Sequence, residues 1–300
     1  MPNKDNNNIV IKKVLQEQNQ GHETRINLFE EIEKIFERPV VSFFTSFQFP
    51  VMIEDADADM LEGFLQNMDL SKGLALMINS PGGSGLAAER IINICRNYSG
   101  TKDYWVIVPN KAKSAATMIC FGASKIYMGA TSELGPVDPQ INIPDNILKR
   151  FSVYKLVEGY RELFEKALKE EGNLQPYLQQ LAKYDEREIR EFQSAIDLSN
   201  DIAIRTLETG MLSGLSKEQI QEQINIFLTP ETKKIHGRPI YMNEAESCGL
   251  KIEKMDINGN LWELIYELYI RLNNFVSTRV SKCVESKKDS FGTAIPKKED

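Results

Sequence analysis

Nearly apolar segments alternate with segments of helical periodicity in the first half of the chain. Leu74–Asn79 is almost entirely apolar, as expected for a strand in a parallel sheet that helices cover on both faces. Tyr104–Pro109 and Lys125–Met128 are the next strand-like runs. Helices are predicted from about Leu86 to Tyr98 and after Ser114. This alternation predicts an α/β layered fold with a parallel sheet.

The remainder of the chain divides into segments of different periodicity. Upstream of the first apolar run, the spacing predicts a helix over Glu23–Phe36, a strand over Val40–Phe49 and a helix over Asp55–Gln66. The predicted organisation is a disordered N-terminal segment (1–22), an α/β domain (23–256) with a helical insertion at about 145–228, a C-terminal helix (257–280) and a disordered charged tail (281–300). Residues 230–256 are expected to form a short strand–helix–strand unit that returns to the domain.

Composition and charge exclude several classes of function. The 300-residue chain carries a net charge of −7, which argues against a nucleic-acid-binding surface. Four cysteines without CxxC spacing and two histidines make a metal site unexpected, and buried free thiols fit a reducing compartment. A signal-peptide pattern and a run long enough to span a membrane are both missing. We therefore expect a cytoplasmic protein. The sequence has no GxGxxG turn, so we expect no nicotinamide site, and we expect no other cofactor.

Two turns supply the candidate chemistry. Ser80-Pro81-Gly82-Gly83 follows one apolar strand, and its glycines allow a ligand to approach backbone N–H groups closely. Ser114 follows the next strand and precedes a helix, so its hydroxyl and the Ala115 N–H lie at a positive helix end. Ligands bind outside the carboxyl ends of parallel strands. The two turns are therefore expected to face one cleft, where acyl transfer on a serine has both of its parts.

These motifs resemble those of a known family. Ile78–Gly83 is similar to the glycine turn of the Clp protease proteolytic subunit and of signal peptide peptidase A. Lys113-Ser114-Ala115-Ala116-Thr117 and Leu134–Gln140 (Leu-Gly-Pro-Val-Asp-Pro-Gln) resemble most the serine dehydrogenase proteinase family. Glu244-Ala245 and Gly249-Leu250 are similar to the late helix of the Clp subunit. The resemblance covers roughly 40–142 and 230–256.

The resemblance implies a fold and a set of roles. The fold would be Clp protease/crotonase-like, a twisted parallel sheet surrounded by helices. Ser114 would be the nucleophile, and Gly82 or Gly83 together with Ala115 would form the oxyanion hole. The activity would be that of a serine peptidase that cleaves polypeptide inside a homo-oligomer.

The general base has two candidates. Where the Clp subunit has a histidine this chain has Asp138, and His236 stands near the place of the family's aspartate, eight residues before Glu244. His236 and Asp138 can thus form the same triad with exchanged positions. The alternative is a Ser–Lys dyad with Lys155, which stands among apolar residues whose packing would bury it and favour the neutral amine.

Two other functions of the same fold stay open, namely a crotonase-type acyl-CoA enzyme and an inactive assembly scaffold. Asp55, Asp57 and Asp59 are interpreted as acids of a first helical turn rather than as cation ligands. The apolar stripe Leu261–Leu272 is typical equally of core packing and of a subunit contact.

Overall fold

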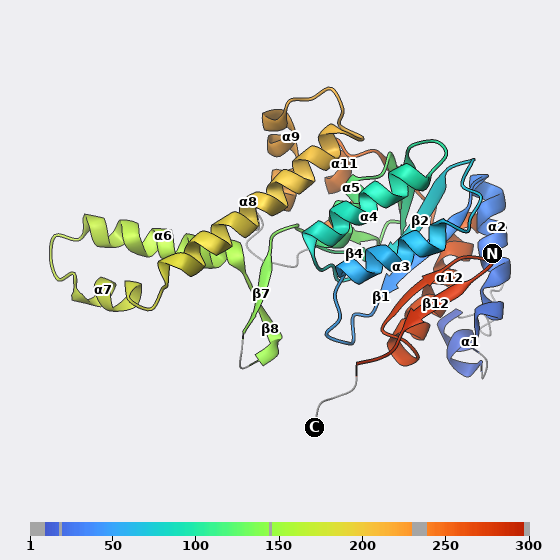
Figure 1. Cartoon of the computed structure of the whole chain (residues 1–300), viewed down its shortest axis with the longest axis horizontal. Helices are drawn as coiled ribbons and strands as arrows, with labels where there is room; N and C mark the ends of the chain where they lie inside the picture. Colours follow the sequence, from blue (N-terminus) through green and yellow to red (C-terminus); the bar gives the residue numbers. More distant parts are fainter. Residues whose placement is uncertain (1–9, 18–19, 144–145, 230–238, 297–300) are drawn as a thin grey trace.

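A mixed, mainly parallel sheet organises the molecule (Figure 1). The computed structural model describes residues 10–17, 20–143, 146–229 and 239–296, with 141–143 and 146–151 described by backbone alone. In the described part, the sheet has seven strands in the order β10-β5-β3-β2-β1-β11-β12. Its parallel strands are β1 (Val40–Thr45), β2 (Leu74–Asn79), β3 (Tyr104–Val108), β5 (Lys125–Met128) and β10 (Ile252–Lys254). The predicted parallel sheet is thus confirmed.

Helices cover both faces of this sheet, which explains why its central strands are apolar throughout. Every residue of β1 and β2 is buried. Leu76 and Ile78 of β2 point to one face, while Ala75 and Met77 point to the other and join a separate cluster. The first face is covered by α3 (Asp55–Leu65), α4 (Gly85–Tyr98) and α5 (Ala115–Phe121), and the second by α2 (Ile26–Phe36) and α12 (Asn260–Thr278).

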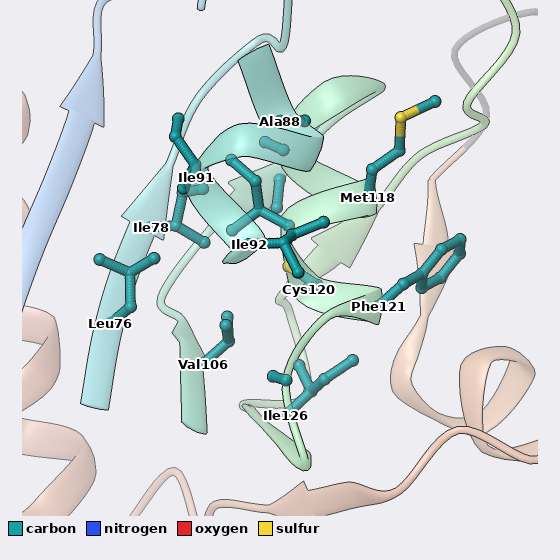
Figure 2. Close-up of a cluster of buried hydrophobic side chains, with 14 of the residues drawn as sticks. Leu76, Ile78, Ala88, Ile91, Ile92, Val106, Met118, Cys120, Phe121 and Ile126 are labelled. Carbon is teal, nitrogen blue, oxygen red and sulfur yellow. The ribbon is translucent and has the colours of Figure 1, made fainter. Parts of the chain in front are cut away.

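The first face contains the core that supports the two turns. Figure 2 shows Ile91 and Ile92 of α4 and Cys120 of α5 packed over Leu76 and Val106 of the sheet. All seven residues of α5 are buried. A short helix buried on all sides has little freedom to shift, so its N-terminus is held at a fixed place above the sheet.

The C-terminal helix resolves one of the open alternatives. Trp262, Ile265, Leu268 and Leu272 of α12 are buried against the second face of the sheet. The apolar stripe in this helix therefore belongs to the core.

Both predicted disordered ends are wrong in their described parts. Residues 10–16 form α1 (Val10–Gln16), whose Val14 is buried, and a 3₁₀ turn, η1 (His22–Thr24), leads into α2. The C-terminal segment forms β11 (Lys282–Glu285) and β12 (Ser290–Thr293), an antiparallel hairpin in which β11 pairs with β1. The charges in β11 are buried in ion pairs. Lys282 contacts Asp57 at 2.8 Å and Glu285 contacts Arg25 at 2.9 Å, so a charged sequence here does not mean a solvated one.

The predicted helical insertion begins differently from the prediction. Its first part is a β-hairpin of β7 (Gln140–Ile143) and β8 (Asn146–Ser152). The helices α6 (Val153–Lys169), α7 (Gln175–Leu181), α8 (Glu186–Glu208), α9 (Lys217–Gln223) and α10 (Asn225–Leu228) follow. Figure 1 shows α6, α7 and the first half of α8 extending from the body as an arm. The second half of α8 returns to the core, where Ile202 and Leu207 are fully buried.

A small second sheet lies beside the carboxyl ends of the main strands. It joins β4 (Lys111–Ala112), β6 (Glu133–Leu134) and β9 (Ile240–Tyr241), and β9 continues directly into α11 (Met242–Ser247). The late strand–helix–strand unit predicted from the sequence is confirmed by β9, α11 and β10. This second sheet positions the candidate site.

Candidate functional site

The glycine turn, Ser80–Ser84, lies directly against the segment that leads to Ser114. The Ser80 N–H donates to the Lys111 carbonyl at 3.0 Å, and the Lys113 N–H donates to the Ser80 carbonyl at 3.1 Å. Ser80 and Ala112 thereby form a parallel bridge. The two turns therefore meet at one edge of the sheet, as expected from the strand order.

Gly82 makes the closest approach between them. Its φ is +98°, and a Cβ at this position would lie 2.8 Å from the Ser114 Cβ and 2.5 Å from the Lys113 carbonyl oxygen. Position 82 therefore favours glycine for two reasons. Residues with a side chain rarely adopt this φ, and the close approach leaves no room for a Cβ. The backbone of the glycine turn is in contact with the candidate nucleophile.

Ser114 has a strained backbone at the start of α5. Its φ is 51° and its ψ is −120°, which a residue with a side chain rarely adopts. Such strain persists only where the surroundings hold it in place, and sharp strand-to-helix turns of this kind present a serine hydroxyl outward. The Ser114 side chain is half-buried and makes no capping hydrogen bond to α5. We call Lys113–Ala115 the serine elbow.

The two glycines differ as candidate donors of the oxyanion hole. The Gly82 N–H already donates to the Ser80 Oγ at 3.1 Å. Gly83 is held from the other side by Ile53, whose N–H donates to the Gly82 carbonyl and whose carbonyl accepts from the Ser84 N–H, both at 2.8 Å. The Ala115 N–H is among the first of α5, and such groups lack a partner within their own helix. This leaves Gly83 and Ala115 as the candidate pair of donors.

Ile53 supports the glycine turn, although no motif in the sequence marks this residue. Ile53 is fully buried in the loop before α3, far from either motif along the chain. The bridge between Ile53 and Gly83 is a tertiary pairing that local periodicity does not encode.

A strap, Glu133–Pro139, crosses the base of the serine elbow. The Gly135 N–H donates to the Thr117 Oγ1 at 3.1 Å, and this hydroxyl donates to the Ala112 carbonyl at 2.8 Å. Beyond this point Val137 is fixed at both backbone groups, since its N–H donates to the Phe227 carbonyl at 2.9 Å and its carbonyl accepts from the Ser199 Oγ at 2.6 Å.

Lys113 joins the elbow to the strap. Its Nζ lies 2.7 Å from the Glu133 Oε2 and donates to the Leu134 carbonyl at 3.0 Å, so its charged end is held by the strap. Both charged side chains are mostly buried, at 19% and 17% exposed. Burial lowers the pKa of the Lys113 ammonium, and the hydrogen bond that this ammonium donates to Glu133 opposes the shift.

The candidate bases have different placements. Asp138 lies in the strap and is 3% exposed. Lys155 lies in the first turn of α6 and is exposed, so the expectation that it is buried is wrong. Its apolar neighbours Val153 and Val157 pack with Ile196 of α8 instead, and Lys155 stands on the other side of the helix. His236 lies outside the described residues.

The acidic cluster and the cysteines have structural roles. Asp57 caps α3 and pairs with Lys282, while Asp55 and Asp59 both pair with Arg90. Among the described residues, no group of three histidine, cysteine or acidic side chains could hold a metal ion. All four cysteines are buried and free, and burial raises the pKa of the Cys95 thiol to about 12.

None of the described helices combines the length and the apolar character that a membrane span requires.

Sequence comparisons relate this chain to one protein family and to two proteins of one organism. A family described as ClpP-like SDH-type serine proteinases matches residues 9–159, about half of the chain. The chain is 28% identical over 259 residues to the uncharacterized protein MJ0137 of Methanocaldococcus jannaschii, covering 85% of this chain and 76% of that protein. It is 29% identical over 116 residues to MJ1495 of the same organism, also uncharacterized, covering 39% of this chain and 36% of that protein.

Two solved structures are similar to part of this chain. Both are variants of the 1510-N membrane-bound stomatin-specific protease, one with serine replaced by alanine and one with lysine replaced by alanine in complex with a substrate peptide. They are 13% and 14% identical to this chain, with TM-scores of 0.30 and 0.31. The matched regions cover 68% and 73% of this chain and 93% of each of those chains.

Proposed function

The chain belongs to the family of ClpP-like SDH-type serine proteinases, and from this premise we propose that it hydrolyses peptide bonds through an acyl-enzyme on Ser114. The observation that carries the proposal is the contact between the Gly82 backbone and the strained Ser114 at the start of α5. A serine with a strained backbone next to backbone N–H donors is typical of a nucleophilic serine.

The reaction follows from these groups. The Ser114 Oγ attacks the carbonyl carbon of the peptide while the base takes its proton. The negative charge on the carbonyl oxygen is held by the N–H groups of Gly83 and Ala115. The C–N bond then breaks, and the amine leaves with the proton from the base. Water attacks the ester in a second round with the same base, which frees the acid and restores the serine.

We assign the base to His236, oriented by Asp138. Asp138 is buried in a strap that hydrogen-bonds to α5, which suits a carboxylate that orients an imidazole. Lys155 is the alternative, but a lysine acts as a base where burial favours its neutral amine, and this side chain is exposed.

The nucleophile is tested by fluorophosphonate labelling with mass spectrometry to locate the adduct. We expect wild type to be labelled on Ser114, and Ser114→Ala to lose labelling and peptidase activity by at least about 1,000-fold. Ser84→Ala is the matched control, because Ser84 also stands at a helix N-terminus, capping α4, and should keep the label. A folded wild type that takes no label would contradict the proposal, and coenzyme A binding by that protein would favour an acyl-CoA enzyme.

The base is tested by comparing the rates at which fluorophosphonate labels Ser114 in wild type and in variants of the candidate bases. We expect His236→Ala and Asp138→Asn to slow labelling by about 100-fold or more, since general-base catalysis typically contributes this much. Lys155→Ala should label at the wild-type rate. Slow labelling of Lys155→Ala, together with wild-type labelling rates for His236→Ala and Asp138→Asn, would assign the base to Lys155.

Substrates and assembly are proposed at a coarser level. Members of a serine proteinase family act on polypeptides, and we propose the same substrate class here. We also propose a homo-oligomer, which sedimentation velocity over a range of protein concentrations tests. A single monomeric species at all concentrations would contradict it.

A further inference from the structure

A partly buried ion pair connects the serine elbow to the strap. Lys113 immediately precedes Ser114, and its Nζ contacts the Glu133 Oε2 at 2.7 Å and the Leu134 carbonyl at 3.0 Å. Lys111 approaches Glu133 as well, at 3.8 Å, from the other end of β4. The first residues of the strap are thus bound to both residues that flank Ala112.

The stem of Lys113 packs as closely as its charged end. A Cβ added at Gly135 would lie 2.6 Å from the Lys113 Cδ and 3.4 Å from its Cα. The strap backbone therefore rests on the lysine side chain along its length. Together with the hydrogen bond from the Gly135 N–H to the Thr117 Oγ1, these contacts fix the height of the strap over the start of α5.

We propose that Lys113 and Glu133 form a positioning pair, which holds the strap with Asp138 in register with Ser114. This inference rests on the proposed serine peptidase activity and assigns the pair no contact with substrate. Asp138 follows Gly135 by three residues. Val137, next to Asp138, is bonded to Phe227 and Ser199. The contacts of Glu133 with Lys113 and of Gly135 with Thr117 therefore set the position of this part of the strap relative to Ser114. The glycine turn keeps its own bonds to Lys111 and Lys113.

The free-energy cost of breaking the Lys113–Glu133 pair keeps the strap in one position. Removing Glu133 leaves the mostly buried Lys113 without its carboxylate, and removing Lys113 leaves Glu133 with only the more distant Lys111. Either loss costs more than the loss of an exposed pair. A misplacement of about 1 Å at a catalytic group can reduce the rate about 100-fold. The pair therefore affects the chemical step more than the binding of substrate.

The test compares labelling rates and peptide hydrolysis for full-length variants. We expect Lys113→Met and Glu133→Gln each to lower kcat and the labelling rate about 10- to 100-fold with little change in KM. Lys113→Arg keeps both the charge and the donors, and should restore much of the rate. Lys125→Met is the matched control, because Lys125 and Glu253 form a pair at 3.1 Å that lies on β5 and β10, in a more exposed setting.

A double variant separates positioning from stability. In Lys113→Met/Glu133→Leu both charges are gone, so the melting temperature should return toward that of wild type. The labelling rate should stay low, because no donor reaches the Leu134 carbonyl. If rate and melting temperature recover together, or if Lys113→Met labels at the wild-type rate, the positioning pair is refuted while the nucleophile assignment stands. If wild type itself takes no label, the proposed function has failed first.

Discussion

At the scale of the residue, the site depends on two neighbouring positions with unusual backbone angles. Gly82 and Ser114 both have a positive φ, and they touch each other. Glycine accepts this conformation without steric cost, whereas serine is strained by it. The strain in Ser114 is therefore supported by the packing that the absence of a side chain at Gly82 allows.

Gly82→Ala is expected to destabilise the protein by about 1–3 kcal/mol and to abolish most labelling of Ser114, because its Cβ would overlap the Lys113 carbonyl and the Ser114 Cβ. Urea denaturation measures the stability. The control is Gly63→Ala in α3, where an added Cβ meets nothing within 4 Å. This substitution should stabilise the helix by up to about 1 kcal/mol. An alanine at 82 with wild-type stability and labelling would disprove this account.

Motif spacing predicted this part of the site, and the structure shows where such reasoning stops. The two turns were expected to meet because both follow neighbouring parallel strands, and the contacts of Ser80 with Lys111 and Lys113 confirm it. The sequence did not predict the direction of the Lys113 side chain toward Glu133, or the support from Ile53. Both depend on how loops fold in three dimensions, which periodicity does not record.

At the scale of the element, ion pairs with distant partners explain why both ends are folded although their composition predicts disorder. Glu17, just after α1, pairs with Arg271 of α12, and Lys13 pairs with Glu267. In β11, Lys282 and Glu285 are buried with partners distant in the sequence. Composition suggested solvated tails, because a charge whose partner lies more than 200 residues away looks unpaired in the sequence.

The pair of Glu17 and Arg271 predicts a pH-dependent docking of α1. The hydrogen bond from Arg271 lowers the pKa of the Glu17 carboxyl below its usual range. A depressed pKa stabilises the fold above the ordinary carboxyl pKa, and this contribution disappears as the pH falls through the lowered value. Glu17→Gln should therefore cost about 1 kcal/mol at pH 7, and the difference from wild type should shrink below about pH 4.

Urea denaturation at several pH values measures this difference. Glu31→Gln serves as the control, because its pair with Lys34 is exposed and contributes little. A difference between Glu17→Gln and wild type that is the same at pH 3 and pH 7 would contradict the assignment.

At the scale of the whole molecule, the body and the arm differ in burial. From residue 158 to 195 no side chain is buried, although each of these residues is described. Exposed apolar side chains such as Phe164, Leu168 and Leu178 lie within this stretch. The layered body was predictable because alternating strands and helices have few topologies, whereas the hairpin of β7 and β8 was missed in a stretch read as helical.

Hydrogen exchange is expected to divide α8 in two. The amides of its first half, in the arm, should exchange faster than those near Ile202 and Leu207, which are fully buried. Mass spectrometry after peptic digestion measures this gradient, and concentration series show whether a second copy covers the arm. Equal protection along the whole helix at every concentration would contradict the described arm.

The pairing of β1 with β11 has a consequence during synthesis. Ser42 and Glu285 are partners in the register, yet 243 residues separate them. A ribosome must translate the chain from β1 through β11 before β1 receives its second neighbour. Until then one side of an apolar strand offers unsatisfied amides and carbonyls to other nascent chains. Pairing of the β11–β12 hairpin with β1 is therefore a late step of folding. A premature stop codon upstream of Lys282 would leave a product prone to aggregate.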